Sequence, residues 1–280
     1  MQPAFILAPR RLGAINWLGF WTLYLKEVRR FLKVFTQTLV SPLVTTLLFL
    51  AIFTLALGRS VQQIGGVSYA EFLFPGLVMM SMVQNAFANT SSSLIIAKIQ
   101  GNIVDLLMPP LRPVELALGL TLGGLTRGIA VGLVSITAVS LLLPIHVHDW
   151  AFVIFNAIAA CLMLSLIGVL AGLWADKFDQ MAAVTNFIIQ PLSFLSGAFY
   201  STQRLPDAWR AIAHLNPFFY MIDGFRYGFI GHADGSLLAG VVVLTSADVL
   251  LGLLLMGAAC SPMRGAATGE DRAGCPPPSG

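Results

Sequence analysis

Long apolar stretches, separated by short polar or charged segments, dominate this chain. A helix that crosses the hydrocarbon core of a bilayer needs about 20 mostly apolar residues. Stretches of that length lie at about 35–57, 70–93, 114–143, 150–174, 181–200 and 237–259. The pattern predicts an all-α integral membrane protein, in which six transmembrane helices form a single domain over residues 1–260.

The segment before the first apolar stretch, 14–34, is too charged to cross a membrane. Its apolar residues recur at the three-to-four-residue spacing of one helix face, and Trp17, Trp21 and Tyr24 are typical of the headgroup region. We expect an interfacial amphipathic helix. An extended first span is the alternative, and the cost of charges in lipid disfavours it. The charged residues in the middle of the segment are Lys26, Glu27, Arg29 and Arg30.

A segment between the fifth and sixth stretches, 201–236, contains two helix starts, one at Pro206 and one at an Asn-Pro pair. Its second half is apolar but too short to span. We predict a re-entrant or interfacial extracellular helical hairpin. Asp223 and Arg226, three residues apart, are expected to pair on one helix face, with a substrate contact as the alternative. The hairpin residues that carry this pattern are Asn216, Pro217, Asp223, Gly224 and Arg226.

The loop between the second and third stretches, 98–112, is predicted to contain a short capped helix. Asn102 is a good N-cap, Asp105 lies in the first turn, and Pro109-Pro110 end the helix. Either a partner protein or the membrane surface covers its apolar side chains, and the pattern alone favours neither. These side chains are Ile103, Val104, Leu106, Leu107 and Met108.

Composition and charge agree with a membrane protein. Only 10% of the 280 residues are charged and 57% are hydrophobic, whereas soluble domains carry about 25% charged residues. With the N-terminus inside, eleven of the sixteen Lys and Arg residues lie on the inner side, four lie outside, and Arg127 lies within the third stretch. Cytoplasmic flanks are enriched in basic residues, so both termini are expected in the cytoplasm. Residues 261–280 are expected to form a disordered tail.

Candidate chemistry inside the spans is sparse. Arg127 and Asp248 lie at membrane depth, where a charge is costly and marks a possible functional position. His146-x-His148 beside Asp149 is a weak metal motif without a further fixed ligand. The sequence has no phosphate-binding loop of the G-x-x-x-x-G-K-[ST] type, no hydrolase motif and no basic, aromatic-lined groove for nucleic acid.

The chain resembles the ABC-2 type transport permeases, the membrane subunits of bacterial ATP-driven exporters. The matching motifs follow one another over most of residues 15–235. They are Ser68-Tyr69, Phe74-Pro75-Gly76-Leu77, Met79-Met80-Ser81, Asn85-Ala86-Phe87-Ala88-Asn89, Gln100-Gly101-Asn102-Ile103 with Leu106-Leu107, Arg127-Gly128, His214-Leu215-Asn216-Pro217 and Gly224-Phe225-Arg226-Tyr227-Gly228-Phe229. After about residue 235 the chain departs from the family pattern.

The resemblance implies a non-enzymatic permease that works as a homodimer in the bacterial plasma (inner) membrane. A separate ATPase subunit would bind ATP and Mg, so this chain would hold no cofactor. The short helix in the loop 98–112 would be the coupling helix of the family, which docks on that subunit. The residues that would make this contact are Gln100, Gly101, Asn102, Ile103, Asp105, Leu106 and Leu107. The substrate class stays open among drugs, lipids and glycolipids or polysaccharides. A stand-alone secondary transporter or channel is the alternative, for which ionisable groups at the midplane are typical, and Asp248 is the candidate.

Overall fold

The computed structural model describes residues 16–58, 63–64, 66–102 and 111–268, which are almost entirely helical. The only strands among them, β1 Gln63–Ile64 and β2 Val67–Ser68, form a small antiparallel hairpin. The helices are α1 Trp17–Lys33, η1 Thr36–Val40, α2 Ser41–Leu57, α3 Tyr69–Ile99, α5 Pro113–Ser140, α6 Trp150–Trp174, α7 Phe178–Val184, η2 Thr185–Ile189, α8 Gln190–Leu195, η3 Thr202–Arg204, α9 Asp207–Leu215, α10 Pro217–Ile230 and α11 Leu237–Thr268.

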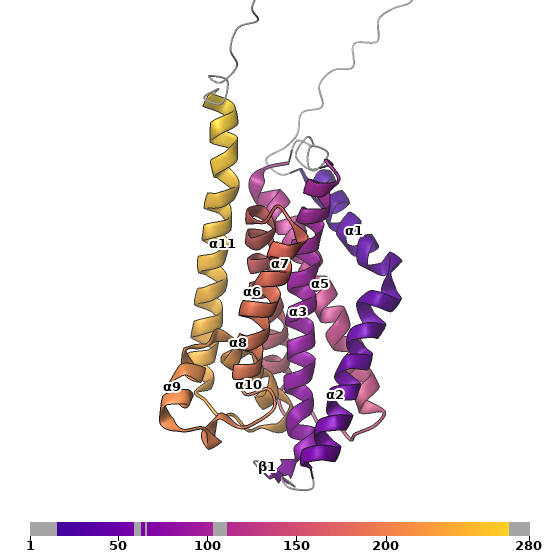
Figure 1. Cartoon of the computed structure of the whole chain (residues 1–280), viewed down its shortest axis with the longest axis vertical. Helices are drawn as coiled ribbons and strands as arrows, with labels where there is room; N and C mark the ends of the chain where they lie inside the picture. Colours follow the sequence, from indigo (N-terminus) through magenta and orange to yellow (C-terminus); the bar gives the residue numbers. More distant parts are fainter. Residues whose placement is uncertain (1–15, 59–62, 65, 103–110, 269–280) are drawn as a thin grey trace, which may run out of the picture.

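Helix α3 is the centre of the bundle. It packs against α6 and α5 most extensively, and also against α10 and α2. Figure 1 shows that α1, the last turn of α3 and the last turns of α11 lie at one end of the bundle, which we call the α1 end. The β-hairpin and α9 lie at the opposite end, the α9 end (Figure 1). The two ends therefore carry different short elements on a shared set of long helices.

Small residues allow the three central helices to approach closely. A Cβ atom added at Gly124 of α5 would lie 2.6 Å from Ser165 Oγ of α6, and one at Gly128 would lie 2.7 Å from Cys161 Sγ. These glycines are one helical turn apart, so they face the same neighbour. Van der Waals contact between close helices is a main source of stability within a bilayer, where no hydrophobic effect drives helices together.

Within the part of the chain that the structure describes, four helical segments are long and apolar enough to cross a membrane: Thr36–Ala56, Pro113–Ser140, Trp150–Trp174 and Leu237–Ala258. They confirm four of the predicted stretches. Helix α3 contains the second stretch but is not among these four segments, because its polar residues lower its mean hydropathy. The fifth stretch is divided between α7, η2 and α8. An integral membrane helical protein is thus established, while the number of six spans stays a prediction.

The other predicted boundaries concern the extracellular hairpin, the C-terminal tail and the coupling helix. The helix starts at Pro206 and Asn216-Pro217 are confirmed by α9 and α10. Helix α11 extends to Thr268, past the predicted boundary at 260, although Pro262 and Gly265 lie in this segment. The disordered tail stays a prediction, and its residues 269–280 lie outside the described ones. The expected coupling helix lies mostly outside the described residues, which do not include Ile103, Asp105, Leu106 or Leu107.

Candidate functional site

A cleft of about 410 Å³ lies between α2, α3 and α8. Hydroxyl and amide side chains from all three helices line it beside apolar and aromatic ones, a mixture that is unusual for a surface at membrane depth. The polar lining residues are Ser41, Thr45, Thr46, Ser81, Gln84, Asn85 and Gln190. The apolar ones are Pro42, Phe49, Leu77, Met80, Phe194 and Phe199.

Both outer walls of this cleft are interrupted helices. A π-helical turn, η1, precedes α2, and another, η2, precedes α8; each is followed by a proline, Pro42 and Pro191 respectively. A proline inside a helix has no N–H to donate and its ring clashes with the carbonyl four residues earlier. Widening the preceding turn is one way to accommodate the ring, and π-turns are frequent at functional sites. Pro42 and Pro191 therefore each follow a π-turn beside the cleft.

Arg127 of α5 is connected to the cleft lining. Its Nη2 donates to Asn85 Oδ1 at 2.9 Å, and Asn85 Nδ2 donates to Ser81 O at 3.0 Å. The side chain is only partly buried, and its Nε has no hydrogen-bond partner among the described residues. Arg127 thus places a cation behind the polar face of α3.

A second polar cluster, which we call the α1 clamp, consists of Glu27, Arg30, Asn89, Ser92 and Ser93. Glu27 is fully buried, with its Oε2 at 2.9 Å from Arg30 Nη2 and its Oε1 accepting from Ser93 Oγ at 2.7 Å. Arg30 Nη2 also donates to Asn89 O and Asn89 Oδ1, at 2.6 and 3.0 Å, and its Nη1 donates to Ser92 Oγ at 3.2 Å. The clamp fastens α1 to α3 by charge-assisted bonds.

The clamp corrects the sequence interpretation of α1. Trp17, Leu18 and Trp21 are exposed, as an interfacial helix requires. Glu27, however, points inward rather than to the polar surface, because Gly123 of α5 leaves room for it: a Cβ there would lie 2.6 Å from Glu27 Cβ. The polar run 89–93 on the neighbouring span was the signal that could have revealed its partners.

Asp223 and Arg226 in α10 do not form the predicted ion pair, and each takes backbone partners from a different loop. Arg226 is almost fully buried; its Nη2 donates to Gly197 O at 2.7 Å, and its guanidinium carbon lies 3.9 Å from the centre of the Phe72 ring. Asp223 accepts from the backbone N–H groups of Asp234 and Gly235 at 2.8 and 2.9 Å. These bonds, which we call the α10 cap, fasten two loops to α10.

The remaining hairpin residues are structural in this geometry. Asn216 caps α10, since its Oδ1 accepts from Phe218 N at 3.0 Å, and Pro217 occupies the first helical position. A Cβ at Gly224 would lie 2.5 Å from Asn156 Oδ1, so the glycine allows α10 to approach α6. Asp234 continues the cap, because its carboxylate accepts from Thr202 N and Ser201 Oγ, both at 2.8 Å.

The described flanks of the loop 98–112 are firmly held. Lys98 Nζ donates to Leu173 O and Ala175 O, at 2.7 and 2.9 Å, at the end of α6. Glu115 accepts from Arg112 N and from Asn16 N, both at 2.9 Å, so it joins the start of α5 to the start of α1. Beyond α3, Gln100, Gly101 and Asn102 form a turn in which Gly101 has a φ of +72°, a conformation that favours glycine.

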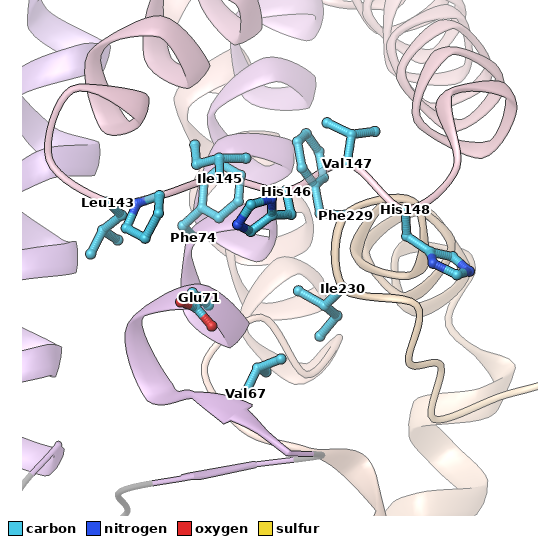
Figure 2. A pocket seen from close by; sticks show the side chains of 11 residues that line it. Val67, Glu71, Phe74, Leu143, Ile145, His146, Val147, His148, Phe229 and Ile230 are labelled. Carbon is cyan, nitrogen blue, oxygen red and sulfur yellow. The ribbon is translucent and has the colours of Figure 1, made fainter.

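A further pocket of about 410 Å³ lies at the α9 end, between Glu71, the loop 143–148 and the end of α10. Figure 2 shows the His146 ring on the pocket side and the His148 ring turned away from it. His148 packs against Tyr227, with ring centroids 5.5 Å apart. The two imidazoles do not converge, and the described residues contain no group of three or more metal-ligating side chains.

Asp248 lies in the middle of the span formed by α11. Its side chain is half-buried, and its Oδ1 has no hydrogen-bond partner among the described residues. It is separate from both the α1 clamp and the cleft lining, so the structure does not bring the two intramembrane candidates, Arg127 and Asp248, into one site.

Comparison with known proteins places these features in a family. Residues 19–230 match the family described as ABC-2 type transporter. The inner membrane transport permease YadH of Escherichia coli K12 is 41% identical over 233 residues, which cover 82% of this chain and 91% of YadH. Nodulation protein J of Neorhizobium galegae is 26% identical over 232 residues, 79% of this chain and 83% of that protein. The chain therefore belongs to the ABC-2 type transporter family, as a multi-pass inner-membrane transport permease.

Proposed function

We propose that this chain is the membrane-spanning permease subunit of an ATP-driven ABC exporter, which moves its substrate outward across the bacterial plasma membrane. The observation that carries this proposal is the cleft between α2, α3 and α8. A polar surface that faced lipid would leave hydroxyl and amide groups without partners in hydrocarbon. The cleft is therefore better explained as one wall of a path for a substrate.

A second copy of the chain supplies the opposite wall in this proposal. Large apolar side chains flank the cleft on α2 and on the η2–α8 segment, and a facing copy would cover them. They include Val44, Leu48, Phe49, Ile52, Phe187, Ile188 and Phe194, each of which is at least 38% exposed. A homodimer would then enclose the polar residues of both clefts between two apolar borders.

Energy comes from a separate ATPase subunit, because the sequence contains no phosphate-binding loop of its own. ATP and Mg would be bound by that partner. The loop 98–112 is the proposed docking element. Its held flanks support this role, since Lys98 and Glu115 connect it to α6, α5 and α1. A displacement of the loop on ATPase binding would therefore be transmitted to α1, α5 and α6 together.

Orientation and substrate complete the proposal. Both termini would face the cytoplasm, which places the α1 end inside and the proposed re-entrant hairpin of α9 and α10 outside. Hydroxyls, amides and aromatic rings in the cleft suit an amphipathic substrate, so a drug, a lipid and a glycolipid or polysaccharide intermediate are the classes to test. A stand-alone secondary transporter or channel is the second candidate. It is favoured by the buried Oδ1 of Asp248, which has no hydrogen-bond partner within the described ranges.

The decisive experiment measures co-purification of the cognate ATPase and transport-linked ATP hydrolysis with the Leu107→Asp variant. Burial of a Leu contributes about 1.5–3 kcal/mol, so its loss alone weakens docking roughly 10- to 100-fold, and the new charge in the contact weakens it further. Leu141→Asp is the matched control, since Leu141 is an exposed leucine that follows α5 at the α9 end. It should leave ATPase binding unchanged.

Equal ATPase binding by the wild type and Leu107→Asp would show that this loop is not the coupling element. Transport by the purified permease without any ATPase would favour the secondary transporter instead. In that case the loss of this activity in Asp248→Asn would assign the coupling to α11.

A further inference from the structure

An almost wholly apolar crevice of about 280 Å³ opens on the side of the bundle between α5 and α6. Its rim consists of exposed side chains, Leu133 on α5 and Ile154 and Ile158 on α6. Its inner wall consists of buried ones, Met82 of α3 and Phe225 of α10. The crevice is separate from the polar cleft, which α2, α3 and α8 form.

Each of the two helices contributes one small residue to the lining. Gly132 of α5 lies against Met82, where an added Cβ would be 2.5 Å from the Met82 sulfur, so Met82 already occupies the space at this glycine. Ala157 of α6 is half-buried in the lining, and its single methyl group leaves space that a larger side chain would occupy.

Apart from the indole N–H of Trp150 at one extremity, the described lining of the crevice has one polar side-chain group, the hydroxyl of Thr137. Thr137 is the hydroxyl residue of the described lining, and its Oγ1 already donates to Leu133 O at 2.8 Å within α5. Apolar cavities of this kind stay dry and bind apolar molecules; one of about 150 Å³ binds benzene. An occupant is therefore expected to be apolar, and the volume is large enough for a segment of a hydrocarbon chain.

The depth of the crevice identifies the source of that hydrocarbon. Both walls belong to segments that are long and apolar enough to cross the bilayer, and the lining residues 129–137 and 150–158 occupy the halves nearer the α9 end. Trp150, 65% exposed at the start of α6, belongs to the lining at one extremity. Tryptophan is enriched at the headgroup level, so the crevice extends from that level toward the membrane interior.

We propose that this crevice is a binding site for one acyl chain of a bilayer glycerophospholipid in the leaflet at the α9 end, with the headgroup at the level of Trp150. The lipid would act as a structural ligand that fills the gap between α5 and α6. This site is independent of the proposed export activity, since it needs neither the ATPase nor a transported substrate.

Photolabelling of the wild-type protein tests the site without any substitution. The protein is reconstituted in vesicles of phosphatidylethanolamine and phosphatidylglycerol with a trace of a phospholipid that carries a diazirine in its acyl chain. Adducts are then located by peptide mass spectrometry. Leu133 and Ile154, 61% and 54% exposed, should be labelled several-fold more than Leu238 and Val242 of α11, which are 78% and 57% exposed at a similar depth.

A crevice-filling variant tests the same site by lipid retention. Phospholipid that co-purifies in mild detergent is counted by mass spectrometry for the wild type, Ala157→Phe and the matched control Val242→Phe. Ala157→Phe should retain one phospholipid fewer per chain, and Val242→Phe should retain as many as the wild type. Equal labelling of α5, α6 and α11 overturns the proposal, and so does equal retention by a folded Ala157→Phe. Should that variant not fold, the photolabelling decides alone.

Discussion

Two pairs of charged residues with the same spacing, Glu27 with Arg30 and Asp223 with Arg226, behave differently at the two ends of the molecule. In the α1 clamp the carboxylate and guanidinium meet at 2.9 Å, and each also bonds to residues of α3. In the α10 cap the two side chains diverge, and each binds backbone groups of a loop. An i,i+3 spacing therefore permits a pair without deciding it.

The neighbouring chain decides the outcome. Beside α1 the partners are mostly side chains of a regular helix. The charges of α1 pair with each other, with the side chains of Asn89, Ser92 and Ser93, and with one helix carbonyl, Asn89 O. Beside α10 the available partners are the N–H and C=O groups of loops, which have no helix to satisfy them. The clamp therefore fastens helix to helix, and the cap fastens loops to a helix.

The largest effect is expected from the more deeply buried arginine. Arg226→Leu removes the bond to Gly197 O and the contact with Phe72, and it leaves a buried carbonyl unsatisfied. The loss should be about 2–4 kcal/mol of folding free energy. Arg210→Leu is the matched control: Arg210 Nη2 also donates to a carbonyl, Gln203 O at 2.8 Å, but the side chain is 40% exposed. Thermal unfolding followed by size exclusion in detergent compares the two, and equal losses would contradict the role of burial.

An intermediate effect is expected at the clamp. Glu27→Ala leaves Arg30 without its counter-charge and Ser93 without its acceptor, which should cost about 1–3 kcal/mol, since Arg30 retains some exposure to solvent. Lys26→Ala, at an exposed neighbouring position, should be close to neutral. The same unfolding assay, together with proteolytic release of α1, measures the difference. A wild-type midpoint for Glu27→Ala would mean that the clamp does not hold α1.

The smallest effect is expected from Asp223→Asn, which sharpens the contrast between the two sites. The amide oxygen still accepts one of the two backbone N–H groups, so the loss should be about 1 kcal/mol. Asp207→Asn, with its side chain 98% exposed, serves as the control and should be neutral. Limited proteolysis within 231–236 reports the loosening of the loop. A loss from Asp223→Asn as large as that from Glu27→Ala would show that a charge partner, rather than backbone amides, holds Asp223.

Most of the long helices could be predicted because a helix that crosses the bilayer needs about 20 mostly apolar residues. The stretch predicted at 150–174 matches α6, and Pro206 and Asn216-Pro217 precede the helices they predicted. Helix α11 extends to Thr268, past the predicted boundary at 260, although the sequence there is rich in Gly, Pro and Ala. The coupling residues of the loop 98–112 stay a prediction wherever they lie outside the described residues.

The sequence by itself determined that this protein is an α-helical membrane protein, because a low charge content and long apolar runs admit few other folds. It also determined the helix starts, since capping residues act on their own few neighbours. Only the tertiary structure decided which polar groups meet. The inward turn of Glu27, the separate partners of Asp223 and Arg226, and the cleft and crevice depend on residues distant in the chain, such as Gly123 beside Glu27 and Gly197 beside Arg226. Local spacing carries no information about such contacts, because they arise only when whole helices pack.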